Sequence, residues 1–85
     1  MRDITNTGNV REWVIDWFEN RFSITRECIE RATKVTDVSY FDLVDRYLLE
    51  YDVETDFDIS VPDGTFDDRD TLDGIVEAIT KLKGE

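Results

Sequence analysis

Large apolar residues recur at three- and four-residue spacing early in the chain, which is the period of one helix face. The stretch opens with Asn9 and Glu12 at the spacing of a capping box, in which each side chain satisfies a free backbone donor of the first turn. We predict a helix over residues 10–22 with a buried apolar face, indoles included. That face comprises Val10, Trp13, Val14, Trp17 and Phe18.

Residues 23–37 contain scattered apolar side chains without a sustained period. A connection of this length is long for a compact domain, so it must be held in place by those side chains. We predict an ordered loop with at most one helical turn.

Helical spacing returns in the middle of the chain, after a Ser-x-x-Asp cap signature formed by Ser39 and Asp42. We predict a second helix over residues 40–54, with its large apolar residues facing the core. These residues are Tyr40, Phe41, Val44, Tyr47, Leu48 and Tyr51.

The remaining pattern predicts helices as well. Residues 57–61 alternate like a strand, but they end at Pro62 without a partner strand, so we interpret them as an extended connector. Residues 65–68 are expected to form a short helix, and residues 70–73 carry the cap of a last one. The apolar stripe of that last helix is Leu72, Ile75, Val76, Ile79 and Leu82.

The predicted fold is therefore all-α: a bundle of three main helices plus a short helix, with a long ordered loop between the first two main helices. A chain of 85 residues supports one domain, here 1–85, of which residues 1–8 are expected to be flexible. The core is predicted to contain Val14, Phe18, Tyr47, Phe57, Ile59, Val61 and Leu72.

The net charge of the chain limits the classes of partner that it can bind. Twenty-one acidic residues against ten basic ones give a net charge of -11, so nucleic acid and anionic membranes are excluded as partners by repulsion. No apolar run approaches the roughly 18 residues of a membrane span, and a lone Cys28 cannot form an internal disulfide. We expect a cytoplasmic monomer.

Catalytic and metal-binding chemistry is not indicated. The chain has no histidine, so Cys28 lacks an imidazole base, and zinc lacks its usual ligands. Residues 56–60 begin like a calcium-binding loop, but Val61 stands where the sharp turn needs glycine and no glutamate closes the loop. We predict a protein without catalytic residues or a metal site.

The order of elements, the acidic second helix and the segment that follows it resemble the acyl carrier protein family. In an alignment without gaps, residues 42–45, Asp-Leu-Val-Asp, fall on the family's Asp-Ser-Leu-Asp/Glu motif, and residues 54–63 fall on its acidic-Phe-Gly-x-x-Ile-Pro-Asp stretch. Residues 70–72 match its Thr-Val start of the last helix. The resemblance covers nearly the whole chain and implies an acyl-carrier-like bundle.

In this register Leu43 occupies the position of the serine that carries the family's 4'-phosphopantetheine arm, and leucine has no hydroxyl to modify. The direct implication is a degenerate carrier without a cofactor. The alternative is a genuine acyl or aminoacyl carrier modified at Ser39, about one helical turn upstream, which requires a longer second helix. Against that alternative, Ser39 is better explained as the cap of the second helix, since an arm at Ser39 would require an insertion in the alignment.

The resemblance also implies that acids of the second helix dock on a basic surface of a partner protein, such as a synthase or a transferase. The residues expected to do so are Asp42, Asp45, Glu50, Asp52, Glu54 and Asp56. A third hypothesis comes from the acidic run over residues 42–73: an acidic mimic of nucleic acid that inhibits a basic protein.

Overall fold

The computed structural model describes residues 9–84, and every regular element within them is helical, without a strand. The elements are α2 (Val10–Phe22), α3 (Arg26–Arg31), the 3-10 helix η1 (Val35–Asp37), α4 (Leu43–Phe57) and α5 (Leu72–Leu82). The predicted all-helical fold is confirmed. The expected flexibility of residues 1–8 concerns positions outside the described range.

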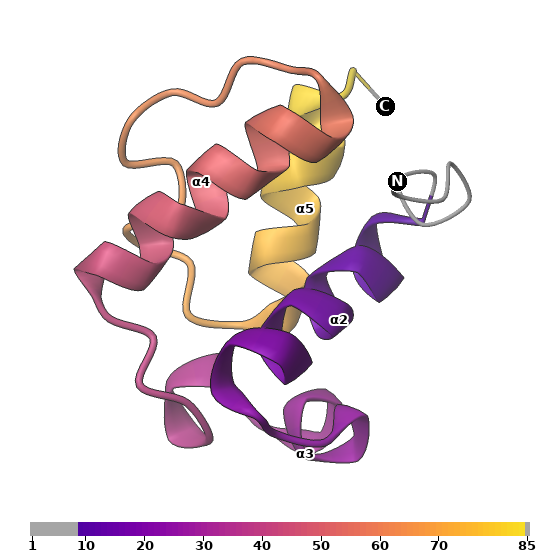
Figure 1. The fold of residues 1–85 in the computed structure, drawn as a ribbon, viewed down its shortest axis with the longest axis vertical. Helices are drawn as coiled ribbons and strands as arrows, with labels where there is room; N and C mark the ends of the chain where they lie inside the picture. Colours follow the sequence, from indigo (N-terminus) through magenta and orange to yellow (C-terminus); the bar gives the residue numbers. More distant parts are fainter. Residues whose placement is uncertain (1–8, 85) are drawn as a thin grey trace.

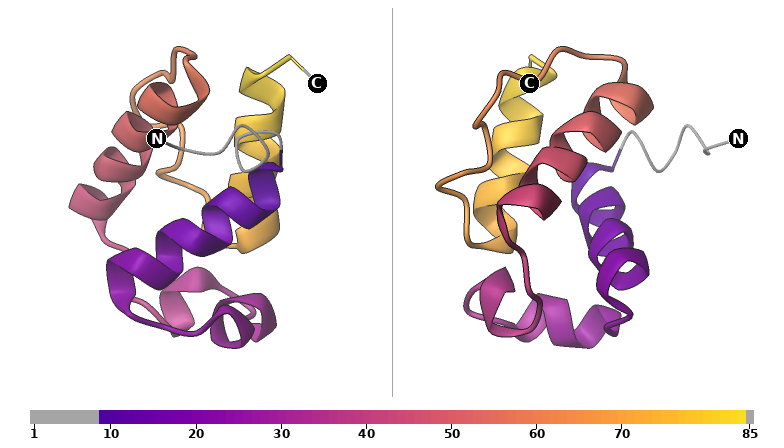
Figure 2. Two further views of the ribbon diagram at one scale, coloured as in Figure 1. Left: turned by 45° about the vertical axis from the view of Figure 1, so that its right-hand side comes forward. Right: turned by 60° about the vertical axis from the view of Figure 1, so that its left-hand side comes forward.

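Helix α2 packs against both α5 and α3 and lies between them in Figure 1. In both views of Figure 2, α3 and η1 lie at the lower end of the molecule beneath α2, while α4 and α5 extend toward the opposite end. None of the helices described combines the length and the apolar character needed to cross a membrane.

Helix α2 has the bounds that its sequence predicts. The side chain of Asn9 accepts a hydrogen bond from the backbone N–H of Glu12 at 3.1 Å, as an N-cap does. The Glu12 carboxylate does not complete the capping box but pairs with Arg26 at the start of α3. Trp13 is buried as predicted, whereas Trp17 is only half-buried.

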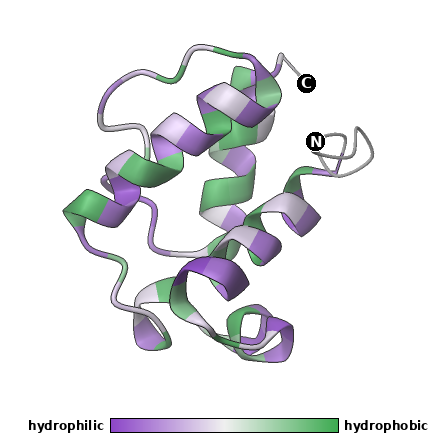
Figure 3. Cartoon of the chain, viewed as in Figure 1, coloured by the Kyte–Doolittle hydropathy of each residue, from purple (hydrophilic) through white to green (hydrophobic). Residues whose placement is uncertain are grey.

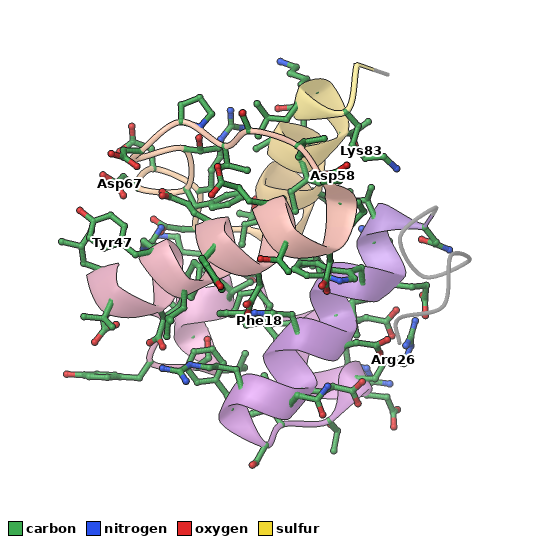
Figure 4. The ribbon with its side chains drawn as sticks, turned by 45° about the horizontal axis from the view of Figure 1, so that its top comes forward. Phe18, Arg26, Tyr47, Asp58, Asp67 and Lys83 are labelled. Carbon is green, nitrogen blue, oxygen red and sulfur yellow. The ribbon has the colours of Figure 1, made fainter. Side chains whose placement is uncertain are left out.

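The core centres on the side chain of Phe18, which is fully buried between the helices (Figure 4). Its ring stacks on Phe22 at 5.7 Å between ring centroids and meets Phe41 at 5.0 Å. Aromatic pairs of this geometry add attraction beyond the burial of their area. A cluster of four rings, completed by Trp17, therefore joins α2 to the segment that precedes α4.

The connection after α2 contains more helix than predicted. Thr25 caps α3 by accepting from the backbone N–H of Cys28, and Ile29 and Val35 are buried anchors. The backbone N–H of Val35 donates to the carbonyl of Asp70 at 2.7 Å, which ties η1 to the start of α5. The prediction of a pinned connection is confirmed. The predicted limit of one helical turn is wrong. Helix α3 was missed because its six residues are too few for apolar side chains to show a helical period.

Helix α4 begins later than predicted, at Leu43 instead of residue 40. Its cap is Asp42, whose side chain accepts from the backbone N–H of Asp45 at 3.0 Å, while the Asp45 carboxylate accepts from the N–H of Asp42. Ser39 does not cap the helix. Its hydroxyl donates to the carbonyl of Val35 at 2.6 Å and so closes the turn of η1.

The predicted orientation of α4 is wrong. Its buried residues are Asp45, Arg46, Leu49, Glu50 and Val53, whereas most of the predicted apolar stripe is exposed, Tyr47 included. Polar groups can lie inward when each has a partner. The guanidinium of Arg46 supplies the largest set of such bonds.

Arg46 organises the segment between α4 and α5. Its guanidinium donates to the backbone carbonyls of Phe66, Asp67 and Arg69 and pairs with the carboxylate of Asp70 at 2.7 Å. Successive turns occupy residues 63–68, so the short helix predicted at 65–68 is absent. The hydrogen bonds from Arg46 to these carbonyls hold the segment as a series of turns around the Arg46 side chain.

Helix α5 matches its prediction. Thr71 caps it by accepting from the backbone N–H of Gly74 at 3.0 Å. A side chain at Gly74 would lie 2.9 Å from the Thr71 hydroxyl, so glycine permits this close cap. Of the predicted core, Val14, Phe18, Val61 and Leu72 are buried, and Phe57 and Ile59 are half-buried.

Candidate docking surface on α4

A row of large apolar side chains covers the solvent side of α4 and the residues that lead into it; we call this row the outer face. Figure 3 shows the apolar first turn of α4 at the edge of the molecule, and in Figure 4 Tyr47 projects away from Phe18. Monomeric proteins rarely leave contiguous apolar patches of this kind uncovered. The exposed fractions are Tyr40 85%, Leu43 52%, Val44 62%, Tyr47 49%, Leu48 38% and Tyr51 65%.

The acids predicted to dock on a partner do not share one exposed face. Docking on a partner requires exposed carboxylates, whereas Asp45 and Glu50 are buried. Asp45 pairs with Arg21 at 2.7 Å, and Glu50 accepts from the backbone N–H of Gly64 at 2.9 Å. Both carboxylates therefore stabilise contacts within the chain.

Two more of these acids link α4 to α2. The indole N–H of Trp13 donates to Asp56 and that of Trp17 donates to Asp52, each at 2.8 Å. The two helices are antiparallel at this contact, since the earlier indole of α2 meets the later carboxylate of α4. Asp52 and Asp56 are half-buried in consequence.

Asp42 and Glu54 remain exposed. The backbone N–H of Asp45, the largest influence, holds the pKa of Asp42 below its ordinary value, and the Asp45 carboxyl lowers it further. Glu54 accepts from the backbone N–H of Val61 at 2.9 Å. Of the six predicted docking acids, these two combine exposure with a fixed position beside the outer face.

Leu43 and Ser39 lie in different surroundings. Leu43 is the first residue of α4, and its hydrocarbon side chain is exposed. Ser39 precedes the cap of α4 and is half-buried, with its hydroxyl bonded to the Val35 carbonyl. The lengthened helix required for an arm on Ser39 does not form.

Burial raises the pKa of Glu50, and the negative charges of Asp63 and Asp67 raise it further. When a carboxyl has a raised pKa in the folded state, the folded protein binds more protons than the unfolded chain between the two pKa values. The stability contributed by Glu50 is therefore complete below its ordinary pKa of 4.5 and is lost as the pH rises through its folded value.

Glu50→Gln is expected to raise the free energy of unfolding relative to the parent chain at neutral pH, since the neutral amide keeps an oxygen for Gly64. The gain is expected to shrink toward zero as the pH falls below about 4.5. Urea titrations over a pH series measure it, with Glu27→Gln, at an exposed position of α3, as the control. A difference that does not vary with pH would contradict this explanation.

Sequence reasoning missed two features of this site. One is Arg46, whose carbonyl partners cannot be seen in a local pattern. The other is the true inner stripe of α4, although Leu49, Val53 and Phe57 at four-residue spacing carried its signal.

No family model, curated protein or solved structure matches this chain. Residues 9–84 also contain no group of three or more cysteine or acidic side chains placed to hold a metal ion.

Proposed function

We propose that this chain is a non-catalytic, acidic docking protein that binds a partner protein through the outer face of α4. The observation that carries the proposal is the uncovered row of apolar and aromatic side chains on a helix whose inner side is fully occupied. Aromatic residues presented in this way are typical of interface centres, where they bury large area at low entropic cost.

The proposal includes an arrangement of helices like that of an acyl carrier protein, without the prosthetic group. Asp42 caps the helix and Leu43 begins it, which supports the register in which leucine replaces the modified serine. The bond from the Ser39 hydroxyl to the Val35 carbonyl counts against an arm on Ser39. Nucleic-acid mimicry has less support, because Asp45, Glu50 and other acids of α4 are engaged within the chain instead of forming an outward array of charge.

A tagged chain isolated from its host under native conditions tests both parts of the proposal. We expect it to retain a discrete partner protein, and we expect Tyr47→Ser combined with Leu48→Ser to lose that partner while keeping the helical spectrum. The intact mass is expected to equal that of the bare polypeptide.

Glu19→Gln combined with Glu27→Gln, on α2 and α3, is the matched control and should retain the partner. Retention of the same partner by the outer-face variant would contradict the docking proposal. A mass increase equal to a phosphopantetheine arm, abolished by Ser39→Ala, would instead make the chain a genuine carrier.

A further inference from the structure

A groove of about 400 Å³ borders the outer face, between α4 and the segment that follows it. Tyr47 and Tyr51 of the outer face line it, and Val61 contributes further apolar surface. Three carboxylates complete the lining: Glu50, Glu54 and Asp63. The groove therefore combines two aromatic rings with a concentration of negative charge.

Two of the carboxylates are fixed by backbone bonds. Glu50 accepts from the N–H of Gly64, and Glu54 accepts from the N–H of Val61, both at 2.9 Å through one oxygen, Oε2. An ionised carboxylate offers about four acceptor sites on two oxygens. The backbone bonds thus orient both groups while leaving Glu54 the capacity to accept from a ligand.

Within residues 9–84, the negative charge of the groove is not paired with a cation. Elsewhere in residues 9–84, acids such as Asp45, Asp70 and Glu77 pair with arginines. No lysine or arginine of this part of the chain forms such a pair with the three groove carboxylates. Burial and the negative charge of Asp63 already raise the pKa of Glu50. A cation in the groove would therefore relieve an existing repulsion.

We propose that this groove receives an arginine side chain of the partner protein. A guanidinium stacks on tyrosine rings and forms paired bonds with carboxylates, whereas a lysine ammonium is a strongly hydrated point charge. Tyr47 and Tyr51 supply rings one helical turn apart, and Glu54 and Asp63 supply acceptors on the two sides of the groove. The lining matches both parts of the guanidinium chemistry.

This inference rests on the proposed docking function and names the chemistry of the partner. Val44, Tyr47 and Tyr51 follow one another at spacings of three and four residues, as in the seam against which another helix packs. The partner is accordingly a basic amphipathic helix with apolar residues along the outer face and an arginine in the groove. A second copy of this chain fits poorly, because its net charge of -11 would face the same carboxylates.

The test uses N-acetyl-arginine N-methylamide as the probe and the full chain labelled for amide NMR. We expect saturable shifts at the N–H groups of Val61 and Gly64, which bond to the groove carboxylates, with binding roughly three- to tenfold tighter than that of the lysine analogue. Glu54→Gln combined with Asp63→Asn should abolish saturation, whereas Glu19→Gln combined with Glu27→Gln should leave it unchanged. Tyr51→Leu should reduce the preference for arginine over lysine.

Shifts spread evenly over all acidic surfaces, equal binding of the two probes, or no saturable shift at Val61 and Gly64 would overturn the inference. Concentration-dependent dimers lost in Tyr47→Ser would overturn it in favour of a second copy. The probe carries no apolar helix, so its binding at the groove and the retention of a partner by the outer face can fail separately.

Discussion

Arg46→Met is expected to lower the free energy of unfolding by about 2–4 kcal/mol, because breaking a buried charge pair costs about 3–5 kcal/mol and Asp70 is partly exposed. Methionine replaces the stem of the side chain but none of its donors. The carbonyls of Phe66, Asp67 and Arg69 would lose their shared partner, and a buried acceptor without a partner is costly. Urea denaturation followed by helical circular dichroism measures the loss.

Arg31→Met is the matched control, because the Arg31 side chain on α3 is exposed and meets Glu27 only at 3.9 Å. We expect that substitution to change stability by less than about 0.5 kcal/mol. Arg46→Lys should fall between the two, since one ammonium cannot reach four acceptors at once. A loss at Arg46 no larger than that at Arg31 would show that the turns of residues 63–68 hold without the guanidinium.

Phe18→Ala is expected to cost about 3–5 kcal/mol, the range for removing a large aromatic side chain from a closed core. The ring is fully buried and contacts Phe22 and Phe41, so its loss opens a cavity where α2 meets the segment before α4. Small domains are stable by only about 5–15 kcal/mol, so a loss of this size is expected to lower the melting temperature strongly and to raise the unfolded fraction at physiological temperature. Tryptophan fluorescence reports the change, because Trp17 packs on the same ring.

Val44→Ala is the control for this prediction, since Val44 is exposed on the outer face. We expect a change of less than about 0.5 kcal/mol there. A large loss at Val44 would mean that the outer face contributes to the fold of the isolated chain, which would weaken the docking proposal. A small loss at Phe18 would mean that neighbouring rings close the cavity.

Much of this fold could be predicted from the sequence because helix ends are set by local contacts. Asn9 and Thr71 cap helices within three residues of themselves, and the apolar period fixed the bounds of α2 and the inner face of α5. Such features depend on spacing along the chain alone. These local features do not depend on how the helices pack against one another.

The candidate site could not be predicted in the same way. Two apolar stripes compete on α4, one running through Val44, Tyr47 and Tyr51 and the other through Leu49 and Val53. The first contains more aromatic area, and the period alone therefore favoured it for the core. The docking role of the acids of α4 was predicted from the resemblance to acyl carrier proteins and not from the apolar period.

What the sequence by itself determined is the all-helical class, the N-terminal caps of α2 and α5, the inner face of α5 and the excess of negative charge. Only the tertiary structure decided which side of α4 lies inward. That choice depends on Arg46 meeting carbonyls more than twenty residues later in the chain, and on Trp13 and Trp17 meeting carboxylates of α4. Bonds between distant segments can bury polar residues and leave tyrosines exposed, because partners rather than hydropathy set the cost of burial.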